Sequence, residues 1–510
     1  MTSTVTVAGE MPGDPLASAA PPRASSISEV VTLAVITVVA AVLRFHGLAT
    51  KPFWFDEGVS VAIARLDWYN FVRILWRREA NMSLYYFLLH FWLHFGGSGY
   101  FIRTLSVLFA VASIPAIYWL GRRLFDARVG LIAASLLAVN AYHVQYSQDA
   151  RSYTLMVLLC ALSSLCFLKC LAEPSCRNRV AYIVVSALAV YAQFFSLLLV
   201  LAHWLSLGRL EPSAGVARLK NDWRWIALAV SPILVFVATT GTGPLRWVHR
   251  PSFGDLWVFA LHMAGNGGPL LLGGLAAAGL GAVIATRPGR YLGRFSLDDW
   301  KCRFLELWII VPPLLTLSVS LVKPLFVPRY FIFCLPAVLL LAAYGVVRLR
   351  SVWLTTPATL LLLALSLNAT AGCYRHDVDI ERDDWRSISQ YLFDHAGPGD
   401  ALLFHVPMGR MPYEFYRSLQ PMTSAPVVLY PHHADHITFL DFVEKPDDAQ
   451  LTGSLANYSR VWLVLTYAET PAGMPDARTL ELTHLLESAF SRVEQHEISG
   501  VKILLYSRTR

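Results

Sequence analysis

The sequence predicts a mainly α, polytopic helical membrane protein with a small α/β domain at its C-terminal end. Three observations lead to this prediction: 55% of the 510 residues are hydrophobic, only 15% are charged, and the mean hydropathy is +0.48. A soluble globular domain usually carries about 25% charged residues. The missing charge indicates that lipid is the solvent for much of the chain.

The distribution of charge and of cysteine excludes several classes of protein. The net charge of +7 does not indicate a nucleic-acid partner, because the basic residues lie mostly in short loops between apolar runs. Such loops are typical of membrane proteins, whose Lys and Arg residues remain at the lipid headgroups. The 7 cysteines contain no C-x-x-C pair. They therefore predict neither a zinc site nor a disulfide framework.

The apolar runs predict the membrane spans. A spanning helix needs roughly 20 mostly apolar residues. Eleven such runs are expected, at 28–48, 101–121, 127–145, 152–171, 178–192, 194–208, 224–241, 267–285, 304–322, 330–348 and 353–371. The stretch 178–208 is interrupted only by Gln193, so one long helix is an alternative there. The stretch Ser83–Phe95 is too short to span, and its aromatic and His residues predict a helix at the membrane interface.

The basic loops predict the orientation and the domain organisation. Placing the N-terminus in the cytoplasm puts most of the basic loops there. Residues 1–27 are rich in Ala, Pro and Ser and predict a disordered cytoplasmic segment. The transmembrane module then covers 28–371, with a first external loop at 49–100, and 372–510 form an extracytoplasmic domain. That loop is rich in arginine, which is typical of a site for an anionic ligand.

The C-terminal domain alternates helix-like and strand-like segments. A helix is expected to begin after Asp383 or Asp384 and to end near Asp394, and another covers Thr479–Phe490. Strands are expected at Ala401–His405, Val427–Tyr430, Val461–Thr466 and Val501–Tyr506. The domain contains no phosphate loop, no G-x-G-x-x-G motif and no nucleophile elbow. It therefore predicts a structural or acceptor-guiding role.

The strongest local signal begins where the first span ends on the outer side. In the segment Lys51–Ser60, the adjacent carboxylates Asp56 and Glu57 follow three aromatic residues. Ionisable groups next to the hydrocarbon are costly and tend to face a cavity or a partner. The pair therefore predicts a general base, a metal ligand or both. The alternative is an ordinary interfacial loop with solvated acids.

An acidic pair directly after the first span resembles the membrane-embedded glycosyltransferases of the GT-C superfamily. The chain is most similar to the bacterial branch with aminoarabinose transferases, protein O-mannosyltransferases and galacturonosyltransferases, that is, glycosyltransferase families 39 and 83. Further matching segments, in this order, are Asn81–Phe87, Arg103–Ser106, Gly121–Phe125, Gln148–Tyr153 and Pro328–Tyr330. Ser83 departs from the family pattern, because Pro is common at that position of the motif. The resemblance covers about residues 28–371 and implies the GT-C fold.

The resemblance also implies a reaction. It predicts an inverting hexosyl- or pentosyltransferase that uses a polyprenyl-phosphate-linked donor. The acceptor is a cell-envelope glycolipid, polysaccharide or protein on the external face of a bacterial inner membrane. Sugar transfer passes through an oxocarbenium-like state and needs a base for the acceptor proton. By resemblance Asp56 is that base, and Glu57 orients Asp56, binds the acceptor or holds a metal.

The lipid phosphate that leaves needs positive charge, and arginine matches phosphate geometry well. Headgroup snorkelling is the alternative for each single cation. The candidates on the outer side are Arg329 with Tyr330, Lys323, Arg246, Arg250 and Arg78.

A second polar cluster lies between two apolar runs and contains Asp149, Arg151 and Tyr153. Together with Asn81 and His249, these residues are candidates for binding the sugar, the acceptor or a metal. Asp149 either joins Asp56 in binding a divalent cation, Mg²⁺ or Mn²⁺, or pairs with Arg151 as a structural ion pair. No other cofactor is expected.

Two other classes of function remain as alternatives. A lipid-linked sugar transporter or flippase would place ionisable residues at mid-membrane and would show internal repeats. The acids here cluster at span ends, and the sequence has no evident repeat. The other alternative is a non-catalytic envelope-assembly protein. The enzyme hypothesis requires that the acidic pair and distant cations converge at the outer membrane boundary.

Overall fold

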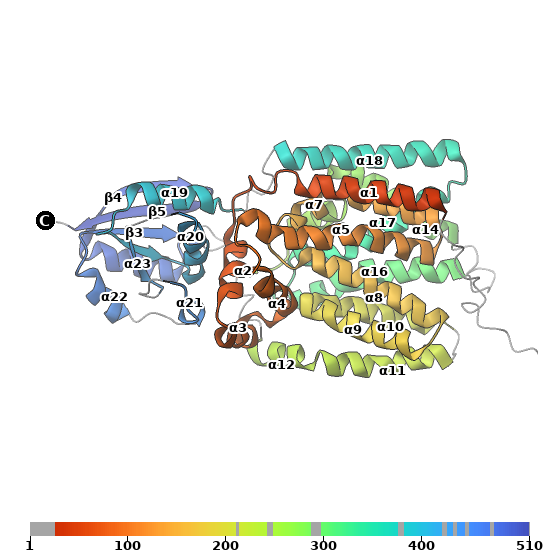
Figure 1. Cartoon of the computed structure of the whole chain (residues 1–510), viewed down its shortest axis with the longest axis horizontal. Helices are drawn as coiled ribbons and strands as arrows, with labels where there is room; N and C mark the ends of the chain where they lie inside the picture. The colour runs from red at the N-terminus through yellow and green to blue at the C-terminus, as the bar shows by residue number, and fades with distance from the viewer. Residues whose placement is uncertain are drawn as a thin grey trace, which may run out of the picture.

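The computed structural model describes residues 26–210, 214–241, 248–286, 297–375, 382–420, 426–431, 436–443, 448–469 and 474–508. These residues form a long helical bundle with an α/β domain at one end (Figure 1). Almost all of the segment 1–27 expected to be disordered lies outside the described residues, and so does Arg246.

Seven helices in the described part of the chain are long and apolar enough to cross a membrane. They are α1 (Ile27–Phe45), α5 (Gly99–Leu124), α8 (Tyr153–Ala172), α14 (Gly268–Thr286), α16 (Leu297–Ser320), η6 with α17 (Pro328–Cys334 and Leu335–Val347), and α18 (Val352–Arg375). Two bent pairs raise the number to 9 if each pair is one span. They are α6 (Ala127–Ala138) with α7 (Ala141–Ser147), and α11 (Ala214–Ala229) with α12 (Ser231–Thr240).

The expected spans at 178–192 and 194–208 correspond to two shorter helices, α9 (Cys176–Ala192) and α10 (Leu197–Ser206). The chain breaks at Gln193 and passes through a short 3₁₀ turn, η3 (Phe194–Ser196). The alternative of one long helix over 178–208 is therefore wrong. The total of eleven spans stays a prediction.

A buried arginine stabilises the bend between α6 and α7. Arg44 is fully buried and donates to the carbonyl oxygens of Leu137 and Ala138 at 3.1 and 2.9 Å. It also contacts Nδ1 of His143 at 2.7 Å. The last carbonyls of a helix have no partner within it, so side-chain donors are needed where the end is buried. Asn140 caps the start of α7 by accepting from the backbone N–H of His143.

Short helices lie between the bundle and the C-terminal domain (Figure 1). They are α2 (Phe55–Arg65), α3 (Trp68–Ile74), η1 (Leu75–Glu79), η2 (Ala80–Met82) and α4 (Ser83–Trp92). A helix is thus present where an interfacial one was expected. Trp68, Tyr69 and Trp76 on this layer are exposed, as is typical of aromatic residues at a membrane–water interface.

The C-terminal domain is built on one five-stranded sheet in the order β2-β1-β3-β5-β4. Strands β1 (Ala401–Phe404), β2 (Val427–Tyr430) and β3 (Arg460–Leu465) are parallel, and β5 (Val501–Arg508) and β4 (Phe490–Ile498) are antiparallel. The helices are α19 (Trp385–His395), α20 (Arg410–Arg417), α21 (Leu440–Val443), α22 (Asp448–Leu455) and α23 (Ala477–Glu487), with the turn η7 (Pro407–Gly409) before α20.

The four expected strands and the helix after Asp384 are confirmed. Strand β4 was not expected, because it is an edge strand whose side chains are mostly exposed and show no apolar alternation. The expected helix Thr479–Phe490 ends earlier, since Phe490 already belongs to β4.

The C-terminal domain sits on α2 through aromatic contacts. Phe53, just before α2, stacks on Phe415 of α20 with ring centroids 4.2 Å apart. Phe55 meets Tyr467, which follows β3, edge to face at 5.5 Å. The carboxyl ends of parallel strands are where ligand sites of such sheets form. Here the loop that follows β3 reaches the start of α2.

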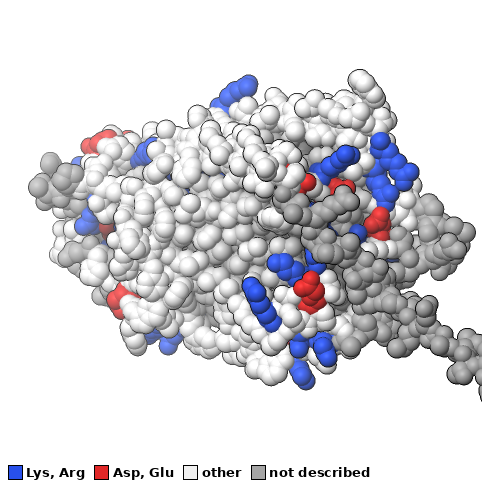
Figure 2. All heavy atoms as spheres, turned by 45° about the vertical axis from the view of Figure 1, so that its right-hand side comes forward, with Lys and Arg blue, Asp and Glu red and all other residues white. Residues whose placement is uncertain are grey.

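The surface charge is unevenly distributed. Figure 2 shows a flank of the bundle that is largely free of charge, with Lys and Arg gathered at the end away from the C-terminal domain. Arg122 and Arg123 at the end of α5 and Arg348 after α17 belong to that end. An uncharged belt with charged ends is typical of a membrane-spanning bundle.

Candidate active site where α2 meets the bundle

The two adjacent acids of the motif point in different directions from the first turn of α2. Glu57 is fully buried, whereas the side chain of Asp56 is 22% exposed. Acids are favoured in this turn because the unpaired backbone N–H groups carry partial positive charge. The helix therefore separates a buried carboxylate from one that solvent can reach.

Glu57 is held on several sides. Arg103 of α5 donates from Nε to Oε1 at 2.8 Å and from Nη2 to Oε2 at 2.6 Å. The backbone N–H of Ala150 donates to Oε1 at 2.8 Å. Arg103 also donates to the carbonyl oxygens of Lys51 and Pro52. Glu57 thereby joins α2, α5 and the loop before α8, and its oxygens are occupied.

Asp56 has a looser environment. Its Oδ2 lies 3.4 Å from Nη2 of Arg151. Arg151 also approaches the hydroxyls of Ser60 at 3.5 Å and Tyr86 at 3.4 Å. A carboxylate that keeps one cationic partner and some solvent exposure can still accept a proton from a ligand.

Asp149 pairs with neither of the residues expected for it. Its two oxygens accept from Nη1 and Nη2 of Arg382, both at 2.7 Å. Asp149 is buried, and Arg382 comes from the segment that leads into the C-terminal domain. The expected ion pair between Asp149 and Arg151 is therefore wrong, because each has another partner. This two-point ion pair, here called the fork between Arg382 and Asp149, links the bundle to the C-terminal domain.

The donor set does not fit a divalent cation. Hard cations need several oxygen ligands in one place, but the oxygens of Glu57 and Asp149 are taken by arginines. In the described ranges no group of three or more His, Cys, Asp or Glu residues could hold a metal ion. A requirement for Mg²⁺ or Mn²⁺ stays a prediction.

Trp54, the residue before α2, lies near two cations from distant parts of the chain. The guanidinium carbon of Arg382 is 5.0 Å from its ring centroid, and that of Arg329 is 5.9 Å from it. Arg329 is the second residue of η6, and its neighbour Tyr330 is buried. Arg151, Arg329 and Arg382 thus surround the residues that begin α2. Their positive charge makes this place suitable for an anion.

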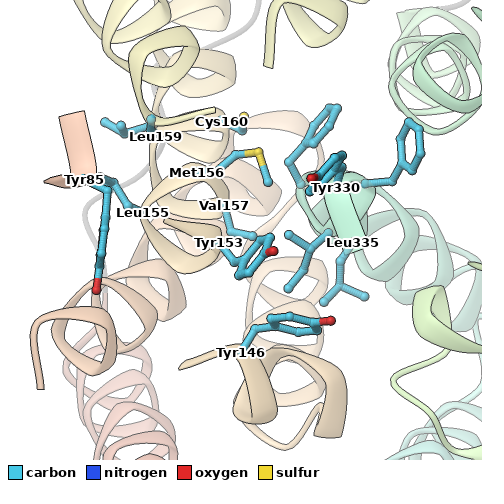
Figure 3. Packing of buried hydrophobic residues seen from close by; sticks show 14 of the residues in the cluster. Tyr85, Tyr146, Tyr153, Leu155, Met156, Val157, Leu159, Cys160, Tyr330 and Leu335 are labelled. Carbon is cyan, nitrogen blue, oxygen red and sulfur yellow. The ribbon is translucent and has the colours of Figure 1, made fainter. Parts of the chain in front are cut away.

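Tyrosines line the bundle side of the site. Figure 3 shows Tyr146, Tyr153 and Tyr330 among apolar side chains of α8 and α17. The rings of Tyr146 and Tyr153 are 4.6 Å apart, edge to face. The hydroxyl of Tyr153 is buried and has no hydrogen-bond partner among the described residues. A buried hydroxyl without a partner is costly and can serve a ligand.

Two further acids adjoin the site. Tyr86 donates to Oε2 of Glu79 at 3.2 Å, and burial raises the pKa of Glu79 although Arg151 opposes the rise. Asp383 is buried next to Arg382. Burial raises the pKa of Asp383 from 3.8 to about 6, and the negative charge of Asp56 adds to the rise.

In the described part of the chain, the other candidates are not bonded to Asp56, although the charge of Arg78 acts on the neighbouring Glu79 and opposes the rise of its pKa. Lys323, Arg250 and Arg78 are exposed, and Asn81 is half-buried in η2. His249 pairs with Asp255 at 3.2 Å. Within the described ranges, no hydrogen bond or ion pair joins any of these side chains to Asp56.

Sequence reasoning missed Trp54, Glu79, Arg103, Arg382 and Asp383 as members of the site. Arg382 and Asp383 stand in the charged run Glu381-Arg-Asp-Asp384, which begins shortly after the last apolar run at 353–371, and a charged cluster near a span end is a usable signal. Glu79 follows Arg77 and Arg78 and shows no such signal.

Solved structures with the same architecture decide the fold. ArnT from Cupriavidus metallidurans in the apo state matches with a TM-score of 0.58 and 12% identity over 94% of this chain and 98% of that chain. The same protein bound to undecaprenyl phosphate matches with a TM-score of 0.54 and 14% identity over the same shares. The chain has the GT-C fold.

A more distant GT-C structure is also similar. Archaeal oligosaccharyltransferase AglB from Archaeoglobus fulgidus, in complex with an inhibitory peptide and a dolichol-phosphate, matches with a TM-score of 0.50 and 11% identity. That match covers 95% of this chain and 74% of that chain. A family model described as dolichyl-phosphate-mannose-protein mannosyltransferase matches residues 82–240 of this chain. No curated protein gives a significant match to its sequence.

Proposed function

We propose that the chain is an inverting glycosyltransferase that moves a hexose or pentose from a polyprenyl-phosphate donor to a cell-envelope acceptor. The observation that carries the proposal is the position of Asp56, partly exposed against Arg151 and two residues after Trp54, whose ring lies 5.9 and 5.0 Å from the guanidinium carbons of Arg329 and Arg382. The GT-C fold, the family model and the two similar proteins solved with a lipid phosphate support it.

The chemistry follows from the two sides of this cluster. Asp56 accepts the proton of the acceptor hydroxyl while the acceptor oxygen attacks the anomeric carbon. The bond from that carbon to the phosphate oxygen breaks, and polyprenyl phosphate leaves with the electron pair. Arg329 and Arg382 stabilise the negative charge that grows on the phosphate. One displacement inverts the anomeric centre.

Glu57 acts as a positioning residue in this proposal. Its oxygens are occupied by Arg103 and by the N–H of Ala150. A carboxylate in a buried ion pair has no access to a substrate proton, so it serves to set the direction of α2. Arg151 holds the neighbouring Asp56.

The orientation is part of the proposal. Lys and Arg gather at the end of the bundle away from the C-terminal domain (Figure 2), which favours that end as cytoplasmic. The site and the C-terminal domain then face the outside of a bacterial inner membrane. Donor and acceptor would meet at the outer boundary, where a lipid-anchored sugar is accessible.

The position of the acids weighs against transport. Asp56 and Glu57 belong to a helix outside the spans, between the bundle and the C-terminal domain. A transporter would hold its ionisable residues at mid-membrane, commonly at broken helices. A non-catalytic assembly role would need neither the exposed Asp56 nor the surrounding arginines.

The test is the activity of purified full-length protein with a polyprenyl-phosphate sugar and extracted envelope acceptors. Asp56→Asn should lower the transfer rate by about 100-fold or more, since a positioned general base contributes about 10²–10⁴. Asp255→Asn, which removes an external acid paired with His249, is the control and should transfer at the parental rate. Equal rates for Asp56→Asn and the parent would refute the proposal. Mass spectrometry of envelope glycans with and without the gene would identify the sugar and the acceptor.

A further inference from the structure

A pocket of about 570 Å³ lies between α2 and the C-terminal domain, on the side of α2 away from Asp56. Gly58, Val61, Ala62 and Arg65 form its α2 wall. These residues recur at intervals of three and four, so they share one face of the helix. Asp56 lies on the opposite face, towards Arg151. The pocket is therefore distinct from the candidate active site, and its volume suits a small ligand or a headgroup, for which about 300–1,000 Å³ is usual.

Among the residues that the structure describes, Arg65 is a cation of the pocket with no acidic partner. Its Nη1 donates to the hydroxyl of Ser418 at 3.3 Å, and its guanidinium lies 5.5 Å from the ring centroid of Phe415. It forms no ion pair with any residue that the structure describes. Burial lowers the pKa of Arg65, and no nearby acid offsets this effect. The side chain of Arg65 is exposed where it lines the pocket, so its guanidinium is accessible to an anion that enters there.

The two acids that line the pocket are already engaged. Asp67 caps α3, accepting from the backbone N–H and the side-chain amide of Asn70 at 3.1 and 2.6 Å. Glu414 accepts from Arg410 at 3.0 Å and from Arg417 at 3.3 Å. An anion entering the pocket would thus meet the guanidinium of Arg65 rather than a bare carboxylate.

The neighbouring helix indicates where the anion comes from. Helix α3 lines the pocket through Asn70 and exposes Trp68 and Tyr69 by 53% and 72%. Trp and Tyr exposed in this way are typical of the level of the lipid headgroups. A pocket bordered by such a helix opens at the level of the lipid headgroups. The anionic group of a membrane lipid at that level is a phosphate, and the planar guanidinium of arginine matches phosphate geometry.

We propose that the pocket between α2 and α20 binds the phosphate of a membrane lipid headgroup, with Arg65 as its main ligand. The lipid would be held beside the C-terminal domain, away from Asp56. This site does not depend on the transfer of a sugar, so it can stand or fall independently of the proposed function.

Lipid titration followed by native mass spectrometry tests the site. The delipidated full-length protein in a zwitterionic detergent would be titrated with phosphatidylglycerol and, separately, with phosphatidylcholine. The parent should bind one phosphatidylglycerol about tenfold more tightly than phosphatidylcholine, and Arg65→Gln should lose this preference. Arg77→Gln removes an exposed cation of the same external layer and should keep it.

A second variant guards against a loss of folding. Ser418→Asp places a carboxylate beside Arg65 without removing the cation, since Ser418 is exposed and already contacts Arg65. It should also abolish the preference, with an unchanged melting temperature. No preference in the parent, or the same preference in Arg65→Gln and Ser418→Asp as in the parent, would overturn the proposal.

A competition arm separates the sources of phosphate. Soluble glycerol 1-phosphate should displace phosphatidylglycerol only at concentrations at least 100-fold higher, because it lacks the lipid tail. Displacement at equal concentration would mean that the site takes a soluble phosphate, and the assignment to a lipid would be wrong.

Discussion

Arg103 and Glu57 form a buried two-point ion pair, with distances of 2.8 and 2.6 Å, that joins the first membrane-spanning helix after the external layer to the acidic motif. Both side chains are at most 2% exposed. Removing one partner of a buried ion pair leaves the other charge buried without compensation. The free-energy cost of that unpaired charge exceeds the net stabilisation that the intact pair provides.

Glu57→Gln is therefore expected to destabilise the protein by about 3–5 kcal/mol, because Arg103 stays buried and charged. Asp56→Asn should cost less than Glu57→Gln, because the Asp56 side chain is 22% exposed and solvent weakens its ion pair with Arg151. Thermal unfolding of both purified variants in the same detergent would measure the difference. A Glu57→Gln protein as stable as the parent, yet inactive, would instead assign Glu57 a chemical role.

The fork between Arg382 and Asp149 is expected to hold the C-terminal domain against the bundle. Asp149→Asn and Arg382→Gln should each cost about 3 kcal/mol, and the double variant should cost clearly less than the sum, because neither residue then leaves an unpaired charge. Unfolding of the parent, both single variants and the double variant completes the cycle. Additive losses would show that the two side chains do not interact in the protein.

Asp383 should make stability depend on pH. Burial raises the pKa of Asp383 from the ordinary value of 3.8, expected in the unfolded chain, to about 6 in the folded protein. Between these values the folded chain binds more protons than the unfolded chain, so stability falls as pH rises from about 4 to about 6. Asp383→Asn removes this penalty and should be more stable than the parent above pH 6 by about 3 kcal/mol, and similar to it at pH 4. Melting temperatures from pH 4 to 8 measure the gap, and a gap that does not change with pH would contradict the prediction.

Gly58 allows α2 and α20 to approach each other. A Cβ atom at this position would lie 2.7 Å from three atoms of Pro412, too close for any real contact. Gly58→Ala should therefore destabilise the protein by about 1–3 kcal/mol.

Gly281 of α14 is a matched control, since a Cβ atom there would meet nothing within 4 Å. Gly281→Ala should be neutral or stabilising by up to about 1 kcal/mol, the usual gain in a helix. If both variants unfold at the same temperature, the contact between α2 and Pro412 is looser than the structure indicates.

Much of the architecture follows from local patterns in the sequence. Long apolar runs such as the one that forms α8, and the short continuous apolar run that forms β3, can be recognised without any partner, because the hydrophobic pattern is set by the residues of one segment. The acidic motif at Asp56 and Glu57 could be located in the same way, as adjacent charges at a span end. Strand β4 could not, since an exposed edge strand lacks that periodicity.

The tertiary structure alone decided the partners. The sequence places Asp56 and Glu57 side by side, but only the packing of α5 against α2 buries Glu57 on Arg103 and leaves Asp56 partly exposed to Arg151. The match of Asp149 with Arg382 joins residues separated by 233 positions. Such pairings depend on how spans and domains pack, which no local pattern encodes, whereas the identity of the charges and their place at the membrane boundary are properties of the sequence itself.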